Sequence, residues 1–353
     1  MQKKLKIIFI PLLFMLATLI PGGSQYGDTA AVPDVQAAVY SDKEKKLIPG
    51  GMTFGVKFFT DGVLVVGFSE GDNSGLSDSP AYAAGIRSGD VILKADGREL
   101  TGTGSLSEAV DASGGKPVEF ICRRNGREFT VTVTPKASSD GNFHAGMWVR
   151  DGGAGIGTVT FIDPDTKVFG GLGHGICDSE TGKPVPLGRG VVMGVTVSGL
   201  RRGSAGTPGE IRGYFEPEKL GAVTGNTDCG VFGVFSNIPE NCGEALPVAS
   251  AKEVAEGPAV IRCTLDNGKV CEYGVELSSI DRNASGGRCF SVKVTDPALL
   301  ELTGGIIQGM SGSPVIQNGK LVGAVTHVLI NDPTSGYGIF IGNMLKGMPE
   351  ALQ

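Results

Sequence analysis

Glycine spacing limits this chain to a mostly β fold. Of its 353 residues, 57 are glycine, more than double the ordinary usage. The glycines separate apolar runs of four to eight residues, which is the length of a strand bounded by tight turns. A chain of this length is too long for one small core, so we expect two compact domains.

Charge and cysteine usage exclude several classes of function. The 31 basic residues face 37 acidic ones and form no stripe that could follow phosphates, so no nucleic-acid partner is expected. Seven cysteines contain no Cys-x-x-Cys pair and no histidine at metal-ligand spacing, so we expect no metal and no organic cofactor. Cys263 and Cys271 flank a predicted hairpin loop, Asp266-Asn267-Gly268, that would set them opposite each other. Either a disulfide or, as we favour, two strand thiols would result.

Residues 1–23 have the pattern of an export signal. Three lysines precede the uncharged residues 7–20, and Pro21-Gly22-Gly23 follows. The 14 uncharged residues fall short of the roughly 20 that span a bilayer as a helix, which favours a cleaved signal over an uncleaved membrane anchor. Residues 24–46 are polar and predict a linker. The remainder is therefore expected outside the cytoplasm.

Residues 47–136 predict a small domain of strands and one helix. Strands are expected at residues 62–68, 91–95, 118–123 and 128–133. Ser105 with Glu108 three residues later predicts a helix that begins at Ser105 with a capping box. Asp96-Gly97 predicts a tight hairpin turn.

Two runs in this region resemble a PDZ domain, the loop at residues 49–56 and the sequence at residues 83–92. The resemblance implies that glycine amides in the loop receive a peptide carboxylate, while the peptide adds as a strand beside the capped helix. The residues expected to bind peptide are Gly50, Gly51, Phe54 and Gly55.

From residue 139 onward, glycine pairs alternate with strands rich in valine and isoleucine. Roughly 210 residues of short strands suit a pair of barrels in one domain, which we expect over residues 139–353.

One turn in this domain offers a nucleophile. In Gly309-Met310-Ser311-Gly312, small neighbours would let the amides of Gly309 and Ser311 point at one place and form an oxyanion hole. A tight turn between strands is the alternative interpretation of the same run.

The chain has three histidines, so the search for a base is short. His174 follows a predicted strand and lies between glycines, where a packed core residue is not expected, so we predict that it is the base. His327 lies within the predicted strand 321–330 and is expected to be structural, with a catalytic role as the alternative. His144 lies near the domain junction and is the weakest candidate.

The order histidine then serine and the pattern Gly-x-Ser-Gly-x-Pro resemble chymotrypsin-like serine peptidases, which implies a chymotrypsin-like double β-barrel after the PDZ domain. One departure is Met310, which stands where those peptidases carry aspartate. The ion pair that locks their processed N-terminus therefore cannot form here.

A closer resemblance, to the stage IV sporulation protein B peptidase family, covers nearly the whole chain. It rests on several runs, at residues 48–51, 62–68, 150–151 with 154–158, 172–174, 304–314 and 323–327 through 331–338. The resemblance implies His174 as base, Ser311 as nucleophile and Asp296 as the carboxylate that orients the base. Asp296 also precedes Pro297 in the pattern of a helix N-cap.

Two other carboxylates remain open as orienting groups for His174. Asp178 lies four residues after the histidine, and Asp228 lies 54 residues after it. The sequence does not decide between them and Asp296.

The same resemblance implies a function and a location. Members are secreted from the forespore into the intermembrane space, where they cleave the regulatory subunit of a membrane-embedded protease complex. That complex processes the precursor of the late mother-cell sigma factor, and the PDZ domain binds peptide or self-associates. The alternatives are a PDZ scaffold with an inactive peptidase-like domain and a general envelope quality-control protease, in which the PDZ domains follow the peptidase.

Overall fold

The computed structural model describes residues 45–69, 79–138, 141–178, 182, 184–240, 242–265 and 268–353. The predicted signal at residues 1–23 and nearly all of the predicted linker lie outside the described residues. The chain forms two compact units, and we describe each by itself. The first contains Phe58–Gly153 and Cys177–Arg189; the second contains the described residues up to Lys57, Ala154–Ile176 and Gly190–Gln353.

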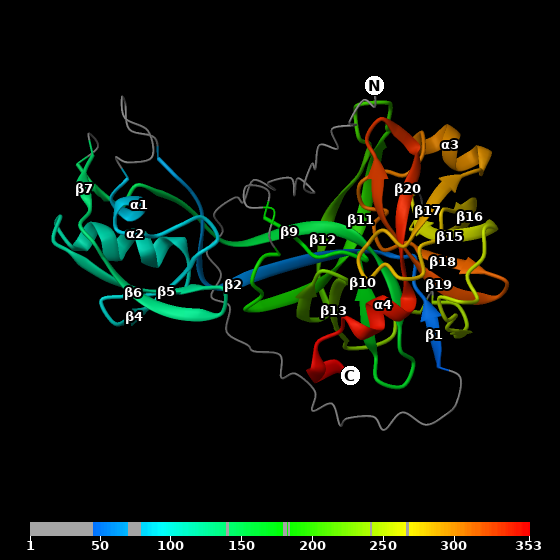
Figure 1. Ribbon diagram of the computed structural model, residues 1–353, viewed down its shortest axis with the longest axis horizontal. Helices are drawn as coiled ribbons and strands as arrows, with labels where there is room; N and C mark the ends of the chain where they lie inside the picture. The colour runs from blue at the N-terminus through cyan, green and yellow to red at the C-terminus, as the bar shows by residue number, and fades with distance from the viewer. Residues whose placement is uncertain are drawn as a thin grey trace. The chain divides into compact units, whose positions relative to one another are not determined.

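The first unit is a small antiparallel sheet with two helices (Figure 1). Its sheet runs in the order β2-β3-β5-β6, with β4 on β3 and a further pairing of β9 with β2. The elements are β2 (Thr53–Phe68), α1 (Pro80–Ala83), β3 (Val91–Ala95), β4 (Arg98–Glu99), α2 (Thr103–Ala112), β5 (Val118–Arg124), β6 (Arg127–Val133), β7 (Lys136–Ala137), β8 (Phe143–His144) and β9 (Met147–Ile162). The four strands predicted from sequence in this region are confirmed.

Alternating burial explains why these strands face one core. Along β5 the side chains of Val118, Phe120 and Cys122 are buried, whereas Glu119 between them is exposed. These three belong to one buried cluster with Ile86 and with Ile92 of the neighbouring strand β3. The predicted turn is also confirmed, because Asp96 and Gly97 both have positive φ between β3 and β4.

The helix α2 begins earlier than the sequence predicts. Its N-cap is Gly102, and Ser105 lies at the third helical position, where its Oγ accepts from Gly102 N at 3.2 Å. A carboxylate from a distant strand completes the cap, since Asp151 Oδ2 accepts from Thr103 N at 2.8 Å. The predicted N-cap at Ser105 is therefore wrong, because a residue 48 positions away supplies the acceptor.

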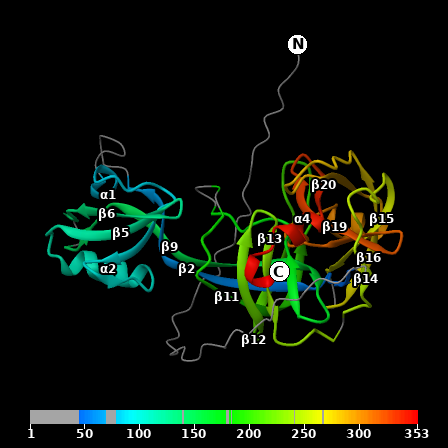
Figure 2. The ribbon, with the colours of Figure 1, turned by 60° about the horizontal axis from the view of Figure 1, so that its bottom comes forward.

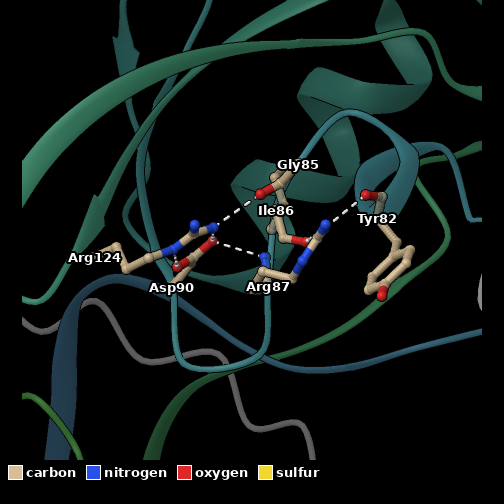
Figure 3. A network of polar contacts seen from close by, with 6 residues as sticks. All are labelled: Tyr82, Gly85, Ile86, Arg87, Asp90 and Arg124. Carbon is tan, nitrogen blue, oxygen red and sulfur yellow. Dashed lines mark hydrogen bonds and ion pairs between the residues drawn. The ribbon is translucent and has the colours of Figure 1, made fainter.

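An ion pair between a buried carboxylate and a partly exposed arginine fixes the loop between α1 and β3 (Figure 3). The carboxylate of Asp90 is 1% exposed, and Arg124 of β5 donates to both of its oxygens, at 2.6 and 2.7 Å. Arg124 also donates to Gly85 O at 2.8 Å, while Arg87 N donates to Asp90 Oδ2 at 2.8 Å. One arginine thus ties both ends of this loop to the sheet.

The second unit contains two sets of strands. The first set runs in the order β14-β1-β9-β10-β13-β12-β11-β2. Its further members are β1 (Lys46–Pro49), β10 (Val168–Gly171), β11 (Arg189–Arg201), β12 (Glu210–Thr227), β13 (Gly230–Phe235) and β14 (Leu246–Pro247). Its core includes phenylalanine rings in contact, with the tilted rings of Phe169 and Phe235 4.7 Å apart and Phe54 meeting Phe169 edge-on.

The second set closes into a six-stranded barrel in the order β15-β16-β17-β20-β19-β18 (yellow to red in Figure 1). The strands are β15 (Gly257–Thr264), β16 (Val270–Ser278), β17 (Phe290–Val294), β18 (Pro314–Gln317), β19 (Lys320–Leu329) and β20 (Asp332–Phe340). The chain adds α3 (Pro297–Thr303), α4 (Ile341–Lys346) and a 3₁₀ turn, η2 (Glu350–Leu352). Figure 2 shows α4 beside β19 and β20.

The hairpin predicted around residues 263–271 is present, with Cys263 directly opposite Cys271 in the register. Both cysteines are free thiols. The loop residues Asp266 and Asn267 lie outside the described residues.

The expected PDZ loop belongs to the second unit, so that prediction is wrong. Gly50 N donates to Thr160 O at 2.9 Å and Gly51 N to Val159 O at 2.8 Å, which engages both amides with β9. Phe54 is 1% exposed, and a Cβ at Gly55 would collide with the ring of Phe215. These residues are packed core, and the first unit begins at Phe58 in place of the expected residue 47.

Within the described residues, no helix has the length and apolar character needed to cross a membrane.

Candidate active site

The turn that carries Ser311 is held rigidly against β9. Thr158 N donates to Ser311 O at 3.0 Å, and Thr158 Oγ1 donates to Gly309 O at 2.7 Å. Gly309 and Gly312 have φ of 100° and 95°, the left-handed region that favours glycine. A Cβ at Gly312 would also collide with the carbonyl of Thr158. The small residues around the serine are therefore required by the conformation of the turn.

Two amides in this turn are available to an external acceptor. The amides of Met310, Gly312 and Ser313 donate to protein carbonyls at 3.1, 2.8 and 2.9 Å. In the part of the chain that the structure describes, the N–H groups of Gly309 and Ser311 have no protein acceptor. Buried amides are normally paired, so this exception is consistent with the predicted oxyanion hole.

His174 lies in a glycine loop after β10. The ring is 9% exposed, and Nδ1 is 2.9 Å from the carbonyl oxygen of Gly175. Because a carbonyl only accepts, Nδ1 carries the hydrogen and Nε2 keeps its lone pair. Burial lowers the pKa of His174, with the Gly175 carbonyl opposing it in part. The imidazole is thus neutral at pH 7, which is the form that a general base requires.

The structure brings Ser311 and His174 to consecutive residues of β19. Ser311 Oγ donates to Thr326 O at 2.8 Å. The ring of His174 lies on the ring of His327, with centroids 4.9 Å apart and planes inclined by 33°. Residues 137 positions apart in sequence therefore meet at the pair Thr326-His327.

Asp296 is the N-cap of α3, as its alternative interpretation predicts. Its Oδ1 accepts from Leu299 N at 3.1 Å and its Oδ2 from Gly274 N at 3.3 Å. Pro297 occupies the first helical turn, and Gly304 ends the helix with φ of 75°. Among the described residues, His174 Nδ1 is paired with the Gly175 carbonyl and with no carboxylate. A catalytic role for Asp296 stays a prediction.

The two other carboxylates occupy different surroundings. Asp178 is 3% exposed and lies in the first unit, where its Oδ2 is 3.1 Å from Arg150 Nη1. Asp228 is exposed at the turn between β12 and β13. Within the described residues, no group of three or more histidine, cysteine, aspartate or glutamate side chains could hold a metal ion.

The sequence did not indicate the role of Thr326 and Gly175, because both act through main-chain carbonyls. His327 was considered and expected to be structural. The chain has three histidines, which are divided between the two units. This rarity was the one sign in the sequence that His174 and His327 could be in contact.

The first unit has another glycine loop, at Gly146, directly before β9. Gly146 has φ of 71°, and its carbonyl accepts from Ser79 Oγ at 2.6 Å. The segment from Phe143 to Asp151, which contains this loop, lies along α2: Phe143 N donates to Asp111 near the C-terminal end of the helix, and Asp151 caps its N-terminus. Trp148 on this segment is 64% exposed. A glycine loop, a strand and a capped helix thus occur together here.

Comparison with known families agrees with both units. A family model described as SpoIVB peptidase S55 matches residues 141–345, which is more than half of the chain. A second model, described as a PDZ domain, matches residues 72–124.

Curated relatives match over shorter segments. A putative zinc metalloprotease of Bartonella henselae is 38% identical over 109 residues, which cover 31% of this chain and 29% of that protein. The serine protease HTRA1 of Xenopus laevis is 34% identical over 61 residues, 17% of this chain and 13% of that protein. The chain thus spans less than a third of the length of these relatives.

Solved structures include the active form of the Rv3671c protease of Mycobacterium tuberculosis. It is 14% identical, with a TM-score of 0.31 over 55% of this chain and 72% of that one. The PDZ domain of an SdrC-like protein of Listeria monocytogenes is 19% identical, with a TM-score of 0.22 over 25% of this chain and 87% of that one.

Proposed function

Since the chain belongs to the SpoIVB peptidase S55 family, we propose that it is a sporulation-signalling serine endopeptidase. Its substrate would be the regulatory subunit of a membrane-embedded protease complex, whose cleavage leads to processing of the late mother-cell sigma-factor precursor. The proposal includes export through residues 1–23 to the forespore intermembrane space, with an uncleaved signal acting as a membrane anchor in the alternative form.

One observation carries the chemistry: Ser311 and a neutral His174 meet at Thr326-His327 beside two amides without a protein acceptor. In the proposed reaction, Nε2 of His174 takes the proton of Ser311 as Oγ attacks the scissile carbonyl. The amides of Gly309 and Ser311 stabilise the oxyanion, and the histidine returns the proton to the leaving amine. No metal or organic cofactor takes part in these steps.

The serine hydroxyl must turn before this reaction. In the structure it donates to Thr326 O, so its hydrogen points at a carbonyl that cannot accept a full proton transfer. Rotation about the Cα–Cβ bond is a change between staggered rotamers. We expect substrate binding to favour the rotamer that donates to His174.

The first unit would supply peptide recognition. The segment from Phe143 to Asp151 runs beside α2, so we expect an extended peptide to add along it, with its carboxylate near the glycine loop. This placement replaces Gly50, Gly51, Phe54 and Gly55, whose surroundings are filled by the second unit.

The test uses purified, signal-free protein and a fluorophosphonate probe. Wild type should be labelled, whereas Ser311→Ala and His174→Ala should not. Ser313→Ala is the matched control, two residues from the nucleophile, and should keep its labelling. A second assay measures cleavage of a peptide from the extracytoplasmic part of a candidate regulatory subunit. Labelling without that cleavage would retain the peptidase and reject the proposed substrate, and labelling of Ser311→Ala would reject the proposed nucleophile.

A further inference from the structure

Thr326, which contacts Ser311, and His327, which contacts His174, occupy a β-bulge. In the pairing of β19 with β20, Val325 lies opposite Gly338 and Val328 opposite Gly336. Two residues of β19, Thr326 and His327, therefore face the single residue Tyr337. Such a bulge interrupts the alternation of side chains and can redirect a side chain toward a site.

Hydrogen bonds hold the bulge in place. Thr326 Oγ1 is 2.6 Å from the carbonyl oxygen of Gly287 and 3.1 Å from that of Tyr337. The first contact ties β19 to the loop before β17, and the second ties it to β20. The bulge is thus a fixed feature of the barrel, and His327 has a defined position.

The environment of His327 keeps its ring uncharged. Burial, together with the neighbouring His174 and Arg288, lowers the pKa of His327 to about 3. Its Nδ1 is buried without a hydrogen-bond partner among the described residues. His327 forms no hydrogen bond through this nitrogen, yet its ring lies on the ring of His174. It therefore acts on His174 through the shape and the flat face of its ring.

We propose that His327 is a positioning residue of the peptidase, whose ring holds the imidazole of His174 in the plane where Nδ1 donates to Gly175. Ring pairs at this centroid distance attract each other beyond the effect of the area that they bury. The stack and the Gly175 carbonyl together set the plane and the tautomer of the base, a task that a carboxylate performs in a triad. This inference rests on the peptidase site proposed above and is independent of the substrate.

The matched variants are His327→Phe and His327→Leu. Both remove the ring nitrogens and both fill the space with apolar atoms, but only phenylalanine keeps a flat ring against His174. The expected result is that the Phe variant retains fluorophosphonate labelling within about twofold of wild type, whereas the Leu variant labels at least about 10-fold more slowly because the base is misplaced. His144→Ala, an exposed substitution in the first unit, controls for the general loss of a histidine.

A second measurement does not depend on activity. With three histidines in the chain, ¹⁵N-histidine labelling allows each imidazole to be followed by NMR. Wild type and His327→Phe should show His174 as one neutral tautomer with its hydrogen on Nδ1 at pH 7. His327→Leu should show averaging of both neutral tautomers.

The outcomes separate this inference from the proposed function. A Leu variant with a single His174 tautomer and wild-type labelling overturns the positioning role. Slow labelling of both variants with unchanged tautomers also overturns it, because a flat ring at position 327 would then not be what positions His174. Wild type that resists the probe contradicts the peptidase activity, while the tautomers still decide the role of His327. Thermal unfolding identifies a misfolded Leu variant, in which case His327→Met replaces it.

Discussion

The hydroxyl of Ser311 donates to the main-chain carbonyl of Thr326 at 2.8 Å, so the predicted nucleophile is held by a residue of the neighbouring strand and not by its base. Both groups are buried. The hydrogen bond defines a resting arrangement in which the serine is ordered but unactivated. It also determines how much the free energy of unfolding should fall when the hydroxyl is removed.

Ser311→Ala should abolish labelling and lower the free energy of unfolding by about 1 kcal/mol, because the carbonyl of Thr326 loses one partner. Urea titration monitored by circular dichroism measures this. A loss of several kcal/mol would mean that the serine is a structural residue of the barrel and would weaken the assignment as a nucleophile.

Stability should fall as the pH drops from 7.5 to 5. Both His174 and His327 have folded-state pKa values below the ordinary 6.5, so the unfolded chain binds more protons throughout this range. His327, whose folded-state pKa is about 3, then contributes a slope that approaches about 1.4 kcal/mol per pH unit between pH 6.5 and 5, and His174 contributes a slope of the same sign. Unfolding of His327→Phe should show a smaller slope than wild type, since one of the two groups is gone. Equal slopes would contradict the lowered pKa of His327.

Two substitutions at Asp296 separate the helix cap from the catalytic role. Asparagine caps a helix about as well as aspartate, so Asp296→Asn should keep the stability and remove only the charge. If the residue is a cap, labelling stays within about twofold; a triad carboxylate would lose about 10⁴-fold in rate on the same change. Asp296→Ala should lower the free energy of unfolding by about 1 kcal/mol in either case.

In the first unit, Arg124→Met should lower the free energy of unfolding by about 3 kcal/mol, because the buried carboxylate of Asp90 is left without its partner. Arg123→Met is the control, since its contacts with Asp61 and Glu128 are at the surface and contribute at most about 1 kcal/mol. Denaturation followed by hydrogen exchange in β5 and β6 reports on this unit. Similar losses for the two arginines would show that the ion pair has no special role.

Trp148→Ala should weaken the capture of a peptide by the first unit while changing its stability by no more than about 0.5 kcal/mol, since the ring is 64% exposed. Fluorescence anisotropy with a panel of C-terminal peptides measures the binding. Tyr214→Ala, an exposed aromatic residue of the second unit, is the control and should not alter it. Unchanged binding in the Trp148 variant would place the peptide elsewhere.

Local patterns made much of this protein predictable. The N-cap at Asp296, the turn at Asp96-Gly97 and the strands of the first unit each depend on a few neighbouring residues, and all three are present. The turn around Ser311 was identified for the same reason. Its glycines are needed within four residues of the nucleophile, so the sequence displays the requirement directly.

Features that join distant segments were not predictable. The start of α2 depends on Asp151, and the loop at Gly50 and Gly51 was assigned to the wrong unit because β2 is one strand that belongs to both units. The contact of His174 with His327 depends on the register of β19 against β20, which no local pattern records.

The extra residue in β19 affects which groups of the strand are available to the site and which hold the barrel together. A regular strand presents its side chains alternately to the inside and the outside, and its carbonyls are used by its neighbours. At Thr326 and His327 the extra residue interrupts this alternation. The carbonyl of Thr326 is then available to Ser311, and the ring of His327 lies against His174. The hydrogen bonds that close the barrel lie on either side of this irregularity. The residues that serve the proposed chemistry therefore lie between the backbone pairs of β19 with β20, and Thr326 takes part in both, because its Oγ1 also bonds to Tyr337 O.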